Sequence, residues 1–194
     1  MPRVGAEPIR RAALVKATIA EIGEAGTLDV TVSRIAKRAG MSSALAHHYF
    51  GGKEDIFLAA MRHVLTVYGA EVRGALAMAD GSRARVEAIV RASFSDTSFR
   101  REVIAAWLNF YVLAQSSAAA RRLLVIYQRR LQANLCHGLR PLVGDRACIV
   151  ANNIAALIDG GYLRQSLGQG AADGQTAVDH VLGYLALELE RATA

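Results

Sequence analysis

Two adjacent histidines, His47 and His48, are the side chains best suited to chemistry in the N-terminal part of this 194-residue chain. They begin the segment HHYFGGKEDIF, where an aromatic pair, two glycines and a lysine follow them. An imidazole can bind a metal ion, transfer a proton or exchange hydrogen bonds with another molecule. The surrounding sequence has to discriminate among these functions.

The spacing disfavours both a metal site and a catalytic site. Adjacent residues on a helix point about 100° apart, so His47 and His48 cannot hold one metal ion together as an i, i+4 pair can. A catalytic imidazole also needs an orienting acid, and no Asp or Glu occurs from Val30 to Lys53. A small helical metalloenzyme that uses these histidines and His63 is therefore only a remote alternative, and no metal or other cofactor is expected.

The same acid-free window is positively charged. It contains Arg34, Lys37, Arg38 and Lys53, in a chain with 23 Lys plus Arg, 17 Asp plus Glu and a formal net charge of +6. A basic surface favours acidic partners such as nucleic acid. The histidines are then either a solvated surface pair or, as we favour, part of a DNA interface.

Helical spacing of apolar residues recurs through the chain, and the three prolines stand at positions 2, 8 and 141. We therefore expect an all-α protein of about nine helices. Capping residues and glycines mark the first three. These helices are expected from Pro8 to before Gly26, from Thr31 to Gly40 and from Ser42 to about Tyr49.

Two short helices joined by a turn of about three residues that contains Gly are typical of a helix-turn-helix. The second of these helices enters the major groove of DNA and needs small or polar residues on its outer face. On this basis Ser43, Ala44, His47 and His48 share the outward arc, and Met41, Ala46 and Phe50 turn back toward the first two helices.

Longer helices are expected to follow the two glycines. The fourth should run from Lys53 to about Met78, with Glu54 and Asp55 in its first turn, where acidic groups complement the helix dipole. The fifth helix should begin at Ser82, the sixth after Asp96-Thr97-Ser98, and the seventh should end before Pro141. Asp145 should cap the eighth helix, which runs to about Leu167, and Asp173 should cap the ninth. Residues 1–52 should form the DNA-binding domain, with its motif at about 31–50, and residues 53–194 a larger helical domain.

The cysteines and the apolar segments indicate in which cellular compartment the protein acts. Cys136 and Cys148 show no metal-type spacing and no disulfide framework, which fits a reducing cytoplasm. The N-terminal segment lacks the apolar run of a signal peptide. Val103 to Ala120 carries no charge, but polar residues interrupt it, so we expect a buried helix and not a membrane span.

The segment TVSRIAKRAGMSSALAHHYFGGKEDIF resembles the DNA-binding head of the TetR family of bacterial repressors. The residues that match the pattern of that family are Thr31, Ala36, Ala39, Gly40, Met41, Ser42, Tyr49, Phe50, Lys53 and Glu54. This resemblance implies that Thr31, Tyr49 and Lys53 bind phosphates, with Ser42 as the cap of the recognition helix. It implies that Ser43, Ala44, Leu45, His47 and His48 face the groove, where many members of the family carry aromatic residues in place of the two histidines.

The second half of the chain is rich in aromatic residues. For each of them core packing is the ordinary explanation, but as a group they could hold a quaternary ammonium ion on their ring faces beside an acid. The aromatic candidates are Phe94, Trp107, Phe110, Tyr111, Tyr127 and Tyr162, and the candidate acids are Asp96 and Asp159.

Four segments extend the resemblance to the choline-responsive, BetI-type repressors of glycine betaine synthesis within the same family. They are MPRVGAEPIRRAALVKATIAEIGEAG, HHYFGGKEDIFLAAMR, AAWLNFYVLAQSS and AALIDGGYLRQSL. This resemblance implies a cytoplasmic homodimer, paired through its last two long helices, that binds a near-palindromic operator and releases it when choline binds. It also implies that residues 53–194 form a ligand-binding and dimerisation domain. A repressor of efflux or other metabolic genes with a more hydrophobic inducer is the alternative. In either case we expect a regulator and not an enzyme.

Overall fold

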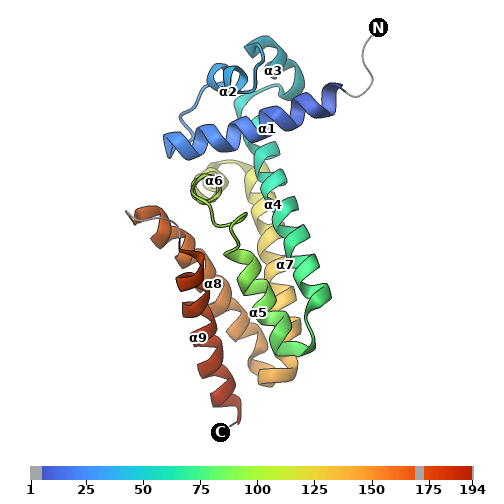
Figure 1. Ribbon diagram of the computed structural model, residues 1–194, viewed down its shortest axis with the longest axis vertical. Helices are drawn as coiled ribbons and strands as arrows, with labels where there is room; N and C mark the ends of the chain where they lie inside the picture. The colour runs from blue at the N-terminus through green and yellow to red at the C-terminus, as the bar shows by residue number, and fades with distance from the viewer. Residues whose placement is uncertain (1–5, 169–172, 194) are drawn as a thin grey trace.

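The computed structural model describes residues 6–168 and 173–193. In that part of the chain, nine α-helices and one short 3-10 turn follow one another, and no strand is present, so the all-α prediction is confirmed (Figure 1). The helices are α1 (Ala6–Ala25), α2 (Val32–Arg38), α3 (Ser43–Phe50), α4 (Lys53–Met78), α5 (Gly81–Ser93), α6 (Arg101–Ser116), α7 (Ala118–Val143), α8 (Ala147–Leu167) and α9 (Gly174–Thr193), with the turn η1 (Gly144–Arg146) between α7 and α8. The Met1-Pro2 opening, which contributed to the resemblance, lies outside the described residues.

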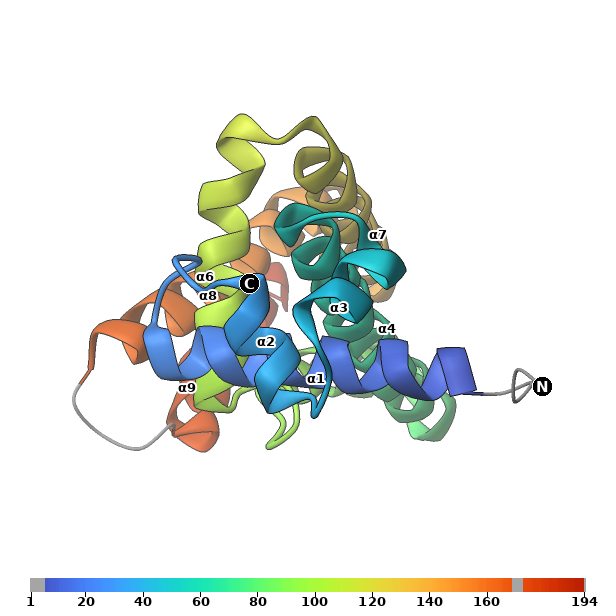
Figure 2. The ribbon, with the colours of Figure 1, turned by 90° about the horizontal axis from the view of Figure 1, so that it is seen from above.

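The helices form a small head above a longer bundle. Helices α1, α2 and α3 make the head, and Figure 2 shows α2 lying across α1 and α3 lying to the side of α1, toward α4. Helix α4 descends from the head beside α7, while α8 and α9 run along the opposite side of the bundle (Figure 1). One continuous apolar core links the two parts, from Leu14 in α1 to Leu185 in α9.

Side-chain caps set the starts of the short helices α2 and α3, and two glycines follow their ends. The hydroxyl oxygens of Thr31 and Ser42 accept hydrogen bonds from backbone N–H groups at the starts of α2 and α3, each at 3.2 Å. Gly40 and Gly51 adopt positive φ angles of 69° and 73° just beyond the two helices, a conformation that costs little only for glycine. The predicted helix-turn-helix and its boundaries are therefore confirmed to within a residue.

Helix α1 packs against the larger part of the molecule as well as against the head. A Cβ atom added to Gly23 would lie 2.6 Å from Glu102 in α6, so the two helices approach too closely for any side chain there. The Asn109 side chain of α6 also donates a hydrogen bond to the carbonyl oxygen of Gly26 at 3.3 Å. The head is thus seated on α6, and the division of the chain at residue 52 remains a prediction.

The junction of α7 and α8 differs from the sequence prediction. Helix α7 does not stop before Pro141 but continues to Val143, because a proline in the last turn removes only one backbone donor and the chain turns at Gly144, with φ 58°. The predicted cap at Asp145 is also wrong. Asp145 lies in η1, and Arg146 directly precedes α8.

The two cysteines are joined, contrary to the expectation from their spacing. Cys136 in α7 and Cys148 in α8 form a disulfide whose Cα atoms are 4.9 Å apart. Spacing rules for disulfide frameworks describe small secreted domains, whereas here the antiparallel α7–α8 hairpin brings together two residues on adjacent helices. The cysteines therefore give no support to a reducing compartment.

Replacing Cys148 by serine should destabilise the protein only under oxidising conditions. A disulfide that closes a loop of this size is worth roughly 3 kcal/mol in the chain-entropy description, and Cys148 is exposed, so the substitution itself costs little. Urea unfolding with and without dithiothreitol measures the difference. Equal stability of wild type and Cys148→Ser without reductant would show that the bond contributes nothing.

Most of the stretch from Val103 to Ala120, which was predicted to be one buried helix, lies in α6, but α6 ends at Ser116 and α7 begins at Ala118. The Val103, Trp107 and Phe110 side chains of α6 are buried in the core. By length and composition alone, one stretch of the described chain, Ala118–Leu167, is apolar enough to cross a membrane. That stretch is the α7–η1–α8 hairpin, whose remaining apolar exposure is concentrated on α8.

Candidate nucleic-acid interface and ligand site

Helix α3 presents the predicted residues on its outer face. Ala44, His47 and His48 are exposed, while Ala46 is fully buried and Phe50 is partly buried against the core. Ser43 is half-buried and donates a hydrogen bond from its hydroxyl to that of Ser33 in α2, at 2.9 Å. The exposed arc consists of small and polar groups, as a helix that enters the major groove requires.

The imidazole of His47 has a defined hydrogen-bond partner. Its Nδ1 atom lies 2.7 Å from the carbonyl oxygen of Gly51, and a carbonyl can only accept, so Nδ1 carries the hydrogen. In a neutral ring the other nitrogen, Nε2, is then an acceptor. His47 therefore offers an acceptor to the solvent side, which suits the amino groups of adenine and cytosine in the major groove.

Two arginines of α1 hold the end of α3. The guanidinium of Arg11 donates to the carbonyl oxygen of Tyr49 at 2.6 Å and lies over the Phe50 ring, 4.5 Å from its centre. Arg10 donates to the Tyr49 hydroxyl at 3.2 Å. The sequence analysis did not include Arg10 and Arg11, although adjacent arginines close to an expected helix start were a usable signal for a basic rim.

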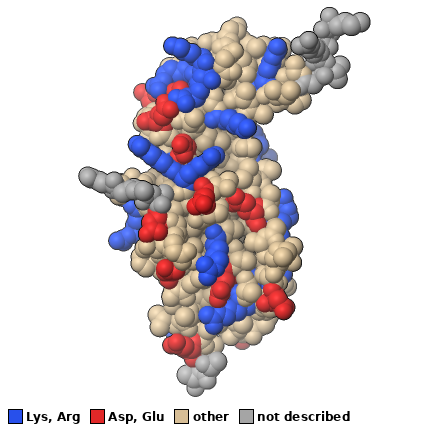
Figure 3. Space-filling model, in the orientation of Figure 1, with Lys and Arg blue, Asp and Glu red and all other residues tan. Residues whose placement is uncertain are grey.

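In the folded protein, acidic side chains of α1 lie beside the segment from Val30 to Lys53, which itself contains no acid. Glu21 of α1 forms ion pairs with Arg34 and Arg38, at 2.9 and 2.6 Å, and Glu24 pairs with Arg38 at 2.5 Å. The hydrogen bond from Arg38 holds the pKa of Glu21 below its usual value. Blue and red side chains accordingly adjoin on the α2 side of the head (Figure 3).

Of the four cations between Val30 and Lys53, Arg34 and Arg38 form ion pairs, and Lys37 and Lys53 have no ion-pair partner in the described part of the chain. Both are exposed. The hydroxyls of Thr31 and Ser42 accept a hydrogen bond as caps, but each still has its own hydrogen to donate. These four groups can therefore still engage phosphates.

The aromatic residues of the larger part gather around one tryptophan. The Trp107 ring centre lies 4.6 Å from Tyr127, 5.8 Å from Tyr111 and 6.3 Å from Tyr162. Phe110 is fully buried behind Trp107, at 5.9 Å. We call Tyr68, Trp107, Tyr111, Tyr127 and Tyr162 the aromatic cluster. Tyr68 joins it because its ring is 5.8 Å from that of Tyr127.

Asp159 is the acid of this cluster. The Tyr111 hydroxyl donates to Asp159 Oδ1 at 2.8 Å, and burial raises the pKa of this carboxyl above its ordinary value of 3.8. Burial also raises the pKa of the Tyr68 hydroxyl to about 12, so the phenol stays neutral. The cluster thus combines one partly buried carboxyl with neutral aromatic rings.

Asp96, the other predicted acid, is exposed and lies outside this arrangement. Phe94 packs with Phe99, 5.0 Å away between ring centres, at the Tyr162 edge of the cluster. Tyr68, Phe99 and Glu71, which accepts hydrogen bonds from Ser95 and Ser98, were missed by sequence reasoning. Tyr68 was missed because the aromatic candidates were sought only in the second half of the chain.

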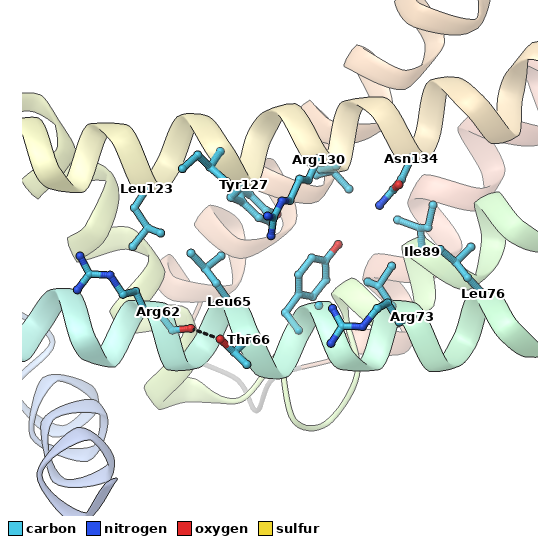
Figure 4. A pocket seen from close by; sticks show the side chains of 15 residues that line it. Arg62, Leu65, Thr66, Arg73, Leu76, Ile89, Leu123, Tyr127, Arg130 and Asn134 are labelled. Atoms are coloured by element: carbon cyan, nitrogen blue, oxygen red, sulfur yellow. Dashed lines mark hydrogen bonds between the residues drawn. The ribbon is translucent and has the colours of Figure 1, made fainter. Parts of the chain in front are cut away.

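A groove lies between α4 and α7 (Figure 4), and α9 runs along the other side of the bundle (Figure 1). The volume of the groove is about 490 Å³. Three guanidinium groups, of Arg62, Arg73 and Arg130, line it together with apolar side chains. Tyr68 and Tyr127 line it too, so the groove borders the aromatic cluster.

The architecture defines a class of protein. A helix-turn-helix head with an outward helix of small and polar residues is seated on a larger helical domain that contains a buried aromatic site with an acid. This combination is that of a DNA-binding regulator that responds to a small molecule.

Comparison with known proteins identifies the family. Residues 14–60 match the bacterial regulatory proteins of the tetR family, and residues 82–190 match the C-terminal domain of the BetI-type transcriptional repressors. The chain belongs to the BetI-type transcriptional repressors of the TetR family. It is therefore a transcriptional regulator and not an enzyme, and the metalloenzyme alternative is set aside.

Individual relatives agree over nearly the whole length. The HTH-type transcriptional regulator BetI of Brucella anthropi is 47% identical over 190 residues, which cover 97% of this chain and 98% of the relative. That of Rhizobium meliloti is 52% identical over 168 residues, or 86% of this chain and 83% of the relative.

Solved structures agree with the fold. A transcriptional regulator from Pseudomonas aeruginosa PAO1 superposes with a TM-score of 0.78 and 28% identity, covering 98% of this chain and 95% of that one. A regulator from Saccharomonospora viridis, determined in complex with choline, gives a TM-score of 0.77 at 20% identity and covers 91% of this chain and 95% of that one. At this identity the second likeness establishes the fold alone.

Proposed function

We propose that this repressor controls choline-to-glycine-betaine osmoprotectant genes and that choline is its inducer. The aromatic cluster with Asp159 carries the proposal. A quaternary ammonium ion offers no hydrogen to donate, so a protein binds it through aromatic faces and a nearby negative charge. Trp107, Tyr127 and Asp159 supply both, and the choline complex of the S. viridis regulator and the BetI name of the relatives support the same ligand.

We propose further that the protein acts in the cytoplasm as a homodimer paired through α8 and α9. Helix α8 has one arc on which exposed apolar residues recur at helical spacing. Ile149, Leu163 and Leu167 are 63%, 50% and 77% exposed on this arc, and Leu187 on α9 is 65% exposed. A two-fold partner would cover them and present two recognition helices to successive turns of an operator, about 34 Å apart.

Choline binding has a direct structural route to the head in this proposal. Trp107 and Tyr111 belong to α6, on which α1 is seated. The Ser117 hydroxyl, which caps α7, donates to Glu54 in the first turn of α4 at 2.6 Å. A change in α6 on choline binding would therefore reach both the first helix of the head and the helix that begins at Lys53.

A mobility-shift experiment tests the proposal. A DNA fragment from upstream of the gene for this protein should be retarded by the purified protein and released by millimolar choline, but not by the same concentration of ethanolamine, which lacks the quaternary group. Failure to bind the fragment would overturn the repressor assignment for that gene. Binding that choline leaves unchanged would overturn choline as inducer.

A more hydrophobic inducer is the second candidate, favoured by the apolar walls of the α4–α7 groove. Thermal shift with choline and with a panel of uncharged lipophilic compounds separates the two. Stabilisation by the lipophilic compounds alone would favour the second candidate.

Two substitutions in the head should have different effects on DNA binding. Lys53→Ala removes an unpaired cation that we assign to a phosphate, so affinity for every sequence should fall, and the salt slope of log K should fall by about one unit. His48→Ala removes a side chain that faces the groove and should change the preference among operator variants instead. Fluorescence anisotropy over a salt series measures both. Equal losses for the two variants on all sequences would contradict these roles.

A further inference from the structure

The α4–α7 groove has a chemistry that does not suit choline. Arg62, Arg73 and Arg130 line it, and none of the three has an ion-pair partner among residues 6–168 and 173–193. In Figure 4, Arg73 rises from α4 and Arg130 descends from α7 into the same space, with Asn134 beside them. A quaternary ammonium ion would be repelled there, while an anion could meet guanidinium groups from both helices.

The walls of the groove are apolar between these cations. Leu65 and Leu76 from α4 and Leu123 and Ile126 from α7 face it, and Ile126 is 42% exposed. The volume of about 490 Å³ lies within the range of about 300 to 1,000 Å³ that is usual for small-molecule sites. An occupant that matches both features carries an anionic head and an apolar chain.

We propose that this groove, which shares Tyr68 and Tyr127 with the aromatic cluster but is lined by three arginines, binds a long-chain carboxylate as a second effector. The carboxylate lies between Arg73 and Arg130, where guanidinium groups form paired hydrogen bonds with carboxylate oxygens. The chain lies along Leu65, Leu123 and Ile126, on one side of the arginines, and removes their apolar surface from water. Because α8 and α9 lie on the other side of the bundle (Figure 1), the proposed dimer partner leaves the groove open.

Titration calorimetry with the full chain tests the site, with decanoate as the probe. Decanoate should bind with a stoichiometry of one per chain, whereas decanol, which lacks the charge, and butyrate, which lacks the chain, should each bind at least about tenfold more weakly. Binding of decanol as tightly as decanoate, or multiple weak decanoate sites per chain, would overturn the proposal.

Three variants localise the binding. Arg73→Gln and Arg130→Gln should each weaken decanoate binding about tenfold, and Ile126→Glu, which puts a negative charge into the groove, should abolish it. Arg129→Gln is the matched control, because this exposed arginine neighbours Arg130 on α7 but does not line the groove. Unchanged decanoate affinity in the Arg73 and Arg130 variants would place the ligand elsewhere and refute the site.

The choline titration separates this inference from the proposed function. Arg73→Gln and Arg130→Gln should keep the choline affinity of the wild type, which also shows that they fold. Loss of decanoate binding with choline binding intact supports the second site. Choline binding without any decanoate binding overturns the second site alone, and decanoate binding without choline binding overturns the choline proposal alone.

Discussion

Leu163→Glu should convert the repressor into a monomer and lower its operator affinity at least about a hundredfold. The residue lies on the exposed apolar arc of α8, between Ile149 and Leu167, so in the proposed dimer a glutamate from each protomer would be buried in the interface. Two linked heads bind a two-part operator far more tightly than one, because the second contact is intramolecular, an advantage of about 10² to 10⁴.

Analytical ultracentrifugation and anisotropy on the same samples measure this effect. Val112→Glu is the control, because Val112 on α6 is also apolar and 63% exposed but lies outside the α8–α9 face. A Leu163→Glu protein that remains dimeric would show that the chains pair through a different surface. A monomer with wild-type operator affinity would show that pairing is not needed for repression.

Asp159→Asn should weaken choline binding about thirtyfold and leave operator affinity without choline unchanged. The substitution keeps the shape and the hydrogen bond with Tyr111 but removes the negative charge from a partly buried aromatic site, where such a charge is worth about 2 kcal/mol. Titration calorimetry with choline measures the loss. Asp96→Asn is the matched control, since Asp96 is the candidate acid that the structure leaves exposed and outside the cluster.

The pH dependence of choline binding gives the same prediction a second test. Burial raises the pKa of Asp159 above 3.8, and a cation binds the ionised carboxylate better than the protonated acid. Choline affinity should therefore fall as the pH falls through the raised pKa, with choline binding releasing a proton in that range. The Asn variant should show no such fall. An equal pH dependence in both proteins would assign the proton to another group.

Local sequence signals predicted the helices well because the causes of helix ends are local. Thr31, Ser42 and Gly51 act through hydrogen bonds and φ angles within a few residues, and the pattern around them is visible in the sequence. Pro141 was misleading because the helix continues only two residues beyond it, so the proline costs a single backbone hydrogen bond there and does not end the helix.

Contacts between residues that are far apart in the sequence could not be predicted from local patterns. Glu21 neutralises Arg34 and Arg38 from another helix, so a window free of acids along the sequence was not free of them in space. The choice between Asp96 and Asp159, and the addition of Tyr68, required knowledge of which helices face one another. The resemblance to a family named the class of ligand but not the side chains that surround it.

The pairing of Glu21 with two arginines affects how the protein finds its operator. Affinity for arbitrary DNA rises with the number of phosphates that a surface can neutralise, and these ion pairs occupy two guanidinium groups at the edge of the head. The repressor should consequently spend little time on each wrong sequence and move on quickly. Glu21, which lies on the first helix and is itself buried, would in this way shorten the search for the operator.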